Sequence, residues 1–127
     1  MTNIFDTHAH YDADRFAAEF AIDANGRRYA GTDGAISYVH DCGADYICNV
    51  GASLPSSHAS LALADRYPFV YAAVGLHPSD AQRIPLDMEE NALSDIREMA
   101  RHKKAVAIGE IGLDYHYDDT DRARQHW

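Results

Sequence analysis

Four short apolar runs, separated by longer and more polar segments, constrain the fold of this chain most strongly. They occupy residues 3–7, 46–50, 69–75 and 105–109. Three of them are nearly continuous rather than alternating, which is typical of parallel strands covered on both faces. Because helix-like segments lie between the runs, the order β-α-β-α-β-α-β predicts an α/β fold with a parallel sheet and right-handed crossovers.

Helical patterns fill the three segments between the runs, and a fourth helix is expected to begin at Arg122. The three segments cover residues 33–41, 55–66 and 88–102. Thr32 is the candidate N-cap of the first segment, and Gly43 suits the position just past its end. Asp87 and Glu90 resemble a capping box at the start of the third segment.

A long polar insertion at residues 14–32 separates the first strand from its helix. The sequence AsnGlyArgArg at 25–28 predicts a tight turn inside it. We therefore expect the insertion to form a loop.

The composition is that of one globular domain, which we expect to cover residues 1–127. The chain is 46% hydrophobic and 24% charged, which suffices for a single core. Its net charge of −9 argues against broad, sequence-independent phosphate binding, which needs a Lys/Arg surface. The charge does not exclude a nuclease, because bound divalent cations can neutralise carboxylates beside a phosphate.

Cys42 falls in a predicted helix and Cys48 in a predicted strand, which argues against a disulfide framework. We expect both to be small core residues of a protein in a reducing compartment. No basic-then-apolar leader follows Met1, and no apolar stretch approaches the roughly 20 residues that span a bilayer. The expectation is a soluble cytoplasmic protein with no membrane partner.

His8 and His10 follow the first predicted strand and are candidate metal ligands. Residues two apart in an extended chain point to the same side, so both imidazoles can face one ion. The pair alone is weak, because 8 histidines in 127 residues give roughly 0.5 such pairs by chance. Position strengthens it, since parallel α/β folds build their sites at the carboxyl ends of the strands.

Glu110 directly follows the fourth predicted strand, between Gly109 and Gly112. Two histidines and a carboxylate suit zinc or another divalent transition metal. The alternative for Glu110 is a solvated charge at a strand end. His77 follows the third strand in GlyLeuHisPro and belongs to the same group of strand-end residues.

Asp6 and Asp114 are candidates to orient a ligating histidine or a basic substrate group. Asp6 could equally be a buried carboxylate bonded to backbone, and Asp114 a turn residue.

The aromatic cluster at 115–117 suggests substrate stacking, although loop packing explains it better. Four other histidines, His40, His58, His102 and His126, fall on predicted helices and are interpreted as surface or packing residues.

No Gly-x-Ser-x-Gly elbow, Walker loop, Rossmann glycine fingerprint or Cys-x-x-Cys pair occurs in the sequence. The main alternatives for the chemistry of an α/β chain are thereby removed.

Four strand-end motifs together give the chain a resemblance to the TatD family of metal-dependent hydrolases. They are FDTHAHYD at 5–12, NVGA at 49–52, VGLHP at 74–78 and AIGEIGLDY at 107–115. The resemblance covers nearly the whole chain except the insertion, and the last motif is highly specific. It implies the N-terminal half of a (β/α)8 TIM barrel, with four parallel strands and intervening helices.

The resemblance further implies a dinuclear centre for divalent metal ions such as Mg, Zn or Mn. His8 and His10 would bind one ion, and Glu110 would bridge two and act in catalysis. His77 would lie near the scissile phosphate as a second catalytic group. The ions would activate water for attack on a phosphodiester of DNA.

By this resemblance, family members place two further histidine ligands and one aspartate on later strands, and the chain ends at Trp127 before any of them. A complete barrel needs about 250 residues. We therefore expect the 127-residue chain to be inactive alone. We also expect it to associate through open barrel edges, with a second copy or with a missing C-terminal half. Two alternatives stay open: a hydrolase of another ester or an amide on the same barrel, and a non-enzymatic, self-associating half-barrel.

Overall fold

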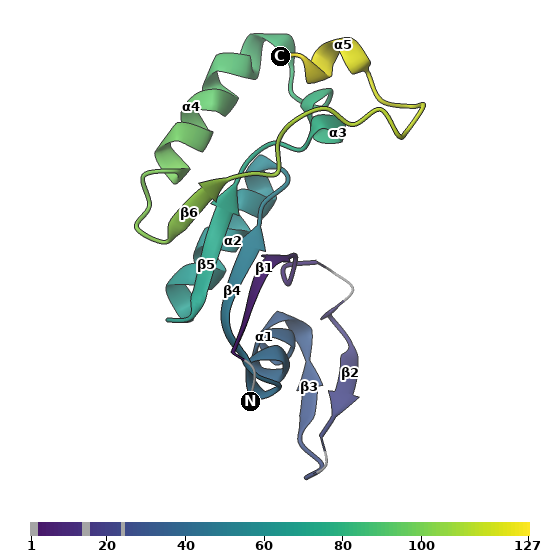
Figure 1. Ribbon diagram of the computed structural model, residues 1–127. Helices are drawn as coiled ribbons and strands as arrows, with labels where there is room; N and C mark the ends of the chain where they lie inside the picture. The colour runs from purple at the N-terminus through teal and green to yellow at the C-terminus, as the bar shows by residue number, and fades with distance from the viewer. Residues whose placement is uncertain (1–2, 14–15, 24) are drawn as a thin grey trace.

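The computed structural model describes residues 3–13, 16–23 and 25–127, and its main feature is a four-stranded parallel sheet. The strands are β1 (Ile4–Ala9), β4 (Ala44–Val50), β5 (Val70–Val74) and β6 (Ala105–Ile108). They lie in the order β1-β4-β5-β6, each parallel to its neighbours (Figure 1). The predicted α/β class and the four predicted strands are confirmed.

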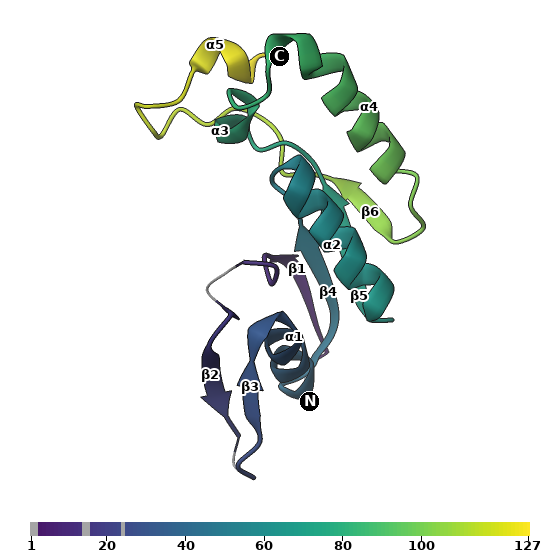
Figure 2. The ribbon, with the colours of Figure 1, turned by 180° about the vertical axis from the view of Figure 1, so that it is seen from behind.

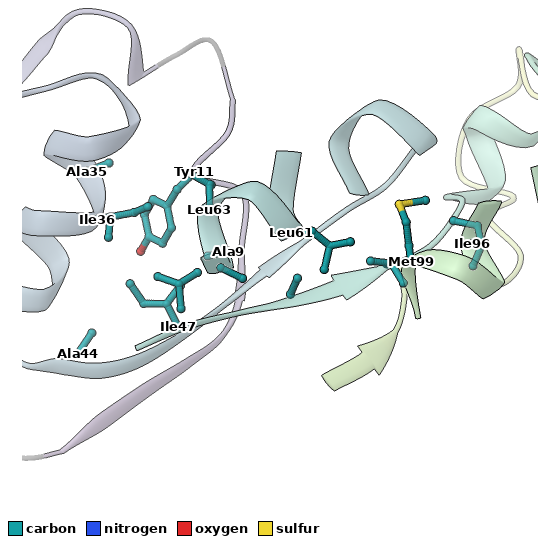
Figure 3. Packing of buried hydrophobic residues seen from close by; sticks show 14 residues of the cluster. Ala9, Tyr11, Ala35, Ile36, Ala44, Ile47, Leu61, Leu63, Ile96 and Met99 are labelled. Atoms are coloured by element: carbon teal, nitrogen blue, oxygen red, sulfur yellow. The ribbon is translucent and has the colours of Figure 1, made fainter. Parts of the chain in front are cut away.

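Three helices cover one face of this sheet: α1 (Gly31–Asp41), α2 (Leu54–Arg66) and α4 (Glu89–Met99). Figure 2 shows α2 lying across β4 and β5. On the sheet, Ile47, Val70 and Val74 are fully buried, and they belong to one core with Ile36 of α1 and Met99 of α4 (Figure 3). Burying each such side chain contributes roughly 1.5–3 kcal/mol. This core fixes the strands whose carboxyl ends carry the candidate site.

Two predicted helix boundaries are confirmed. Gly43 follows α1 with φ of +109°, a conformation that favours glycine. Helix α2 has Pro55 in its first turn, and Ser53 forms a capping box with Ser56.

Two predicted caps are wrong. The Thr32 hydroxyl donates instead to the carbonyl of Tyr11 at 2.8 Å, so it ties the chain after β1 to α1. Asp87 lies inside the short 3-10 turn η2 (Leu86–Met88), and Met88 takes the N-cap position of α4 without a side-chain bond.

The insertion is an antiparallel hairpin rather than a loop, except that residues 14, 15 and 24 lie outside the described residues. Its strands are β2 (Glu19–Ile22) and β3 (Arg28–Ala30). The predicted tight turn is present: the N–H of Gly26, which has φ of +80°, donates to Asp23 O. Tyr29 is buried against Tyr38 of α1, with ring centroids 5.1 Å apart. This contact holds the hairpin on α1. The dipeptide Asn25–Gly26 is the sequence feature that indicates a hairpin here.

The segment after β5 contains α3 (Pro78–Ala81), and the chain ends with α5 (Arg122–Gln125). The helix predicted from Arg122 is therefore present. Arg124 holds it in place, because its guanidinium pairs with Glu89 and donates to Ile84 O at 2.8 Å.

Cys42 and Cys48 are both free, and Cys48 is buried as predicted. The prediction that Cys42 is a core residue is wrong, because this exposed residue is the C-cap of α1. Among the described residues, no helix is long and apolar enough to cross a membrane.

The second face of the sheet carries an exposed apolar patch, whereas Cys48, Val50 and Ala73 form a small buried cluster. Phe5, Tyr46, Tyr71 and Val106 line a shallow pocket there, and Val106 is 54% exposed. Within the described part of the chain, β1 and β6 each have only one neighbouring strand in this sheet. The accessible surface is 7782 Å², against about 6,700 Å² expected for a compact monomer of this mass.

Candidate metal centre

The two candidate histidines face each other at the carboxyl end of β1. His8 is the fifth residue of the strand, and His10 follows its last residue, Ala9. Their Nε2 atoms lie 3.2 Å apart. The two-residue spacing therefore brings both rings to one place.

Glu110 follows β6, at the opposite edge of the sheet from β1, and its carboxylate lies close to both histidines. Its Oε1 lies 3.6 Å from His8 Nε2, and its Oε2 lies 3.9 Å from His10 Nε2. One ligand atom from each of the three residues lies within 4.8 Å of the others. The three residues predicted as metal ligands are thus brought together.

The backbone after β6 crosses the ends of β5 and β4 to deliver this carboxylate. Gly109 N–H donates to Val74 O at 2.9 Å, and Glu110 N–H donates to Gly51 O at 3.0 Å. Gly75 makes the crossing possible, because a Cβ on it would lie 2.5 Å from the carbonyl carbon of Gly109. The glycine at the end of β5 is therefore a steric requirement for the position of Glu110.

A hydrogen bond to β4 fixes the His10 ring. Nδ1 of His10 lies 2.8 Å from the carbonyl oxygen of Val50. Since a carbonyl only accepts, Nδ1 carries the proton, and in the neutral ring Nε2 has a free lone pair. Nε2 is the atom that faces His8 and Glu110. A histidine that binds a metal needs this tautomer, in which the nitrogen facing the ion carries no proton.

The three side chains fit a divalent cation. Ligand atoms about 2.1 Å from one tetrahedral ion lie about 3.4 Å apart, close to the separations found between His8, His10 and Glu110. Two histidines and a glutamate are also a known ligand set of catalytic zinc, which leaves a further position for water. Other divalent ions accept the same donors.

Comparison with protein families decides the relationship of the chain. The family model described as TatD related DNase matches residues 5–127. The chain belongs to the TatD family.

Relatives in this family are longer than the chain. "Uncharacterized metal-dependent hydrolase YabD" of Bacillus subtilis is 34% identical over 94% of the chain and 40% of its own length. "3'-5' ssDNA/RNA exonuclease TatD" of Edwardsiella piscicida is 31% identical over 80% of the chain and 38% of its own length. The chain therefore spans about 40% of the length of these relatives.

A solved TatD structure supports the fold. The crystal structure of a hydrolase TatD family protein from Entamoeba histolytica matches with a TM-score of 0.73 and 21% identity. The match covers 98% of the chain and 42% of that protein. The four strands and their helices thus correspond to part of a TatD barrel, as the sequence predicted.

His77 lies outside the three-residue cluster of this TatD chain. It is the N-cap of α3, and its Nδ1 lies 2.6 Å from the hydroxyl of Ser79. Its backbone N–H donates to Ala52 O at 2.8 Å, which places it beside the end of β4. The contact of His77 with a substrate phosphate therefore stays a prediction.

Asp6 does not orient an imidazole ring. Its Oδ1 accepts the backbone N–H of His8 at 3.3 Å, and its Oδ2 accepts the hydroxyl of Tyr11 at 2.9 Å. Burial, followed by the bond to Asp6, raises the pKa of Tyr11 above its usual value. Asp6 supports the ligand segment through its backbone and through Tyr11.

Asp114 behaves as a turn residue, the alternative that the sequence left open. Its Oδ1 accepts the backbone N–H of His116 at 2.9 Å, and its own backbone pairs with the Gln125 side chain. Nearby, the exposed Tyr115 bonds to His126 through its hydroxyl at 2.9 Å, so the aromatic loop is held by α5 and its end.

Two helix-associated histidines have the packing roles that we expected. His40 stacks on Phe69 with ring centroids 3.9 Å apart, and His102 lies 3.4 Å from the carboxylate of Asp65.

Tyr11 and Asn49 support the site, and sequence reasoning gave neither of them a role. Tyr11 N–H donates to Asn49 Oδ1 at 2.7 Å. A usable signal was the polar Asn49 inside the otherwise apolar run at 46–50, because a buried polar side chain requires partners.

Proposed function

We propose that this chain supplies metal ligands to a divalent-metal-dependent phosphodiesterase that acts on DNA. The observation that carries the proposal is the convergence of His8, His10 and Glu110 at the carboxyl ends of the strands. Membership of the TatD family and the hydrolase and exonuclease names of its relatives support it.

His8, His10 and Glu110 are the residues that would hold the metal. When bound, divalent ions activate water and stabilise the oxygens of the reacting phosphate. Both oxygens of Glu110 face the histidine pair, Oε1 toward His8 and Oε2 toward His10, so that either oxygen could serve as the third ligand. Val50 O keeps the proton of His10 on Nδ1, so that the Nε2 lone pair stays available.

The proposed substrate is DNA, and His77 is proposed to contact its phosphate. The chain carries a net charge of −9, so a phosphodiester beside Glu110 requires cations for charge neutralisation. The Edwardsiella piscicida relative is named a 3'-5' ssDNA/RNA exonuclease. We propose that the complete site of this chain likewise cleaves a phosphodiester bond.

The 127-residue chain is proposed to be inactive when alone. Three ligands hold one ion, whereas a dinuclear centre needs more protein groups than this cluster offers. The remaining groups would come from the part of the barrel that the chain does not cover.

The test joins this chain to the C-terminal part of YabD, the relative that it matches over 40% of its length. The purified hybrid is incubated with Mg²⁺ or Mn²⁺ and single-stranded DNA labelled at either end. We expect metal-dependent release of nucleotides that is lost in Glu110→Gln. DNA cleavage that survives Glu110→Gln would contradict the role of the cluster. Hydrolysis of a phosphomonoester or an amide without DNA cleavage would instead favour another hydrolase on the same barrel.

A further inference from the structure

Asn49 is a fully buried polar side chain in β4, next to the site but outside the ligand cluster. It pairs with Ala9 in the register between β1 and β4, so it lies level with the end of β1. A buried amide is costly unless its donors and acceptor are bonded, and here they all are.

The amide of Asn49 joins three parts of the fold. Its Nδ2 donates to Ser60 Oγ of α2 at 2.8 Å and to Asp12 Oδ1 at 2.9 Å. Its Oδ1 accepts the backbone N–H of Tyr11 at 2.7 Å. Ser60 is also fully buried, so the amide is anchored to a rigid helix.

These bonds reach the residue that directly follows His10. Tyr11 is held at each of its polar groups: its N–H by Asn49, its carbonyl by Thr32 and its hydroxyl by Asp6. The next residue of β4, Val50, fixes the ring of His10 through its carbonyl. Adjacent residues of β4 therefore hold the backbone after His10 and the His10 ring itself.

We propose that Asn49 is a positioning residue for the metal centre. Its amide oxygen holds the backbone at Tyr11, so that the His8 and His10 Nε2 atoms stay turned toward Glu110. The inference rests on the proposed function, in which these three residues bind a metal.

Ser60 offers a matched control for a role in stability alone. Ser60→Ala removes one bond of the Asn49 amide inside the same buried network but leaves the bond from Tyr11 N–H intact. Asn49→Ala removes all three bonds of the amide, including the bond from Tyr11 N–H. If Asn49 only stabilised the fold, the two variants would differ in melting temperature but not in metal affinity.

Metal affinity is measured by calorimetric titration of Zn²⁺ into the 127-residue chain and both variants. Removing partners that orient metal ligands costs about 10–100-fold in affinity, and we expect a loss in this range for Asn49→Ala. Ser60→Ala should stay within about twofold of the wild type, because the bond to Tyr11 persists. Equal affinities of Asn49→Ala and wild type, or an equal loss in Ser60→Ala, would overturn the proposal.

A measurement without metal separates this proposal from the proposed function. Amide hydrogen exchange at Tyr11 should be slow in the wild type and roughly tenfold faster in Asn49→Ala, as expected for one lost hydrogen bond. If Zn²⁺ does not bind the wild type while Tyr11 shows this pattern, the metal assignment fails and the anchoring by Asn49 holds. If Asn49→Ala does not fold, amide exchange at Tyr11 in the wild type still tests the proposal. Exchange at Tyr11 as fast as at exposed loop amides would overturn the proposal.

Discussion

Oε1 of Glu110 lies 3.6 Å from Nε2 of His8, although β1 and β6 are opposite edges of the sheet. The chain after β6 covers this distance by crossing the end of β5 and bonding to Gly51 after β4. The convergence of Glu110 with His8 and His10 therefore depends on Gly75, which lets the backbone cross.

Gly75→Ala should damage both the fold and the metal centre. The added Cβ would lie 2.5 Å from the Gly109 carbonyl carbon, so the segment that carries Glu110 must move. We expect a loss of about 1–3 kcal/mol in the free energy of unfolding, as for overpacked sites, together with weaker Zn²⁺ binding. Denaturant unfolding and metal titration measure the two effects.

Gly109→Ala is the control for this prediction. A Cβ on Gly109 would meet no atom within 4 Å, so the new methyl group itself causes no clash. Equal losses of stability in the two variants would show that the close approach at Gly75 is not what positions Glu110.

The two cysteines should differ sharply in reactivity. Cys42 is exposed, whereas Cys48 is only 5% exposed. Burial, and secondly the Asp6 carboxylate, raises the pKa of the Cys48 thiol above its usual 9.0. Because the thiolate is the nucleophile, a raised pKa lowers the reactive fraction at any pH below it. Alkylation at pH 8, followed by mass spectrometry of peptides, should label Cys42 first and Cys48 only after unfolding. Equal labelling of the folded chain would show that the second face of the sheet is open at Cys48.

His77→Ala should leave metal affinity unchanged, whereas His10→Ala should reduce it strongly. His10 belongs to the cluster, whereas Nδ1 of His77 is bonded to Ser79 at the start of α3. In the hybrid with YabD, we expect His77→Ala to weaken DNA binding and His10→Ala to abolish cleavage. Comparable losses of metal affinity in the two variants would place His77 among the ligands.

The open face of the sheet predicts self-association of the 127-residue chain. The accessible surface of the chain exceeds that expected for a compact monomer by about 1,000 Å². This excess is comparable with the roughly 800 Å² that each partner buries in a standard interface. Val106→Lys should reduce association in sedimentation experiments, because it charges this face. Leu86→Lys is the control, since Leu86 is also exposed but lies in η2 rather than in the sheet. A wild-type chain that is monomeric at high concentration would contradict this prediction.

The strands and the convergence of His8, His10 and Glu110 were predictable because both follow from local patterns. Continuous apolar runs predict buried parallel strands, and the two-residue spacing of His8 and His10 predicts that their rings meet. Glu110 was predictable from its place after a strand, since such positions gather at one edge of the sheet.

The supports of the site were not predictable, because they depend on contacts between distant segments. No local pattern shows that Asn49 accepts a bond from Tyr11 or that Thr32 bonds to Tyr11 instead of capping α1. The packing of the hairpin on α1 through Tyr29 and Tyr38 is likewise a contact that no local pattern shows. Propensity alone does not decide such tertiary contacts.

The central claim is that His8, His10 and Glu110 jointly hold a divalent ion. Titration of Zn²⁺ into the 127-residue chain, compared with His8→Ala, His10→Ala and Glu110→Gln, tests it most directly. We expect one equivalent to bind weakly, with affinity lost in each of the three variants while each stays folded. Binding that survives all three substitutions would contradict the claim, and so would tight binding of two ions by the chain alone.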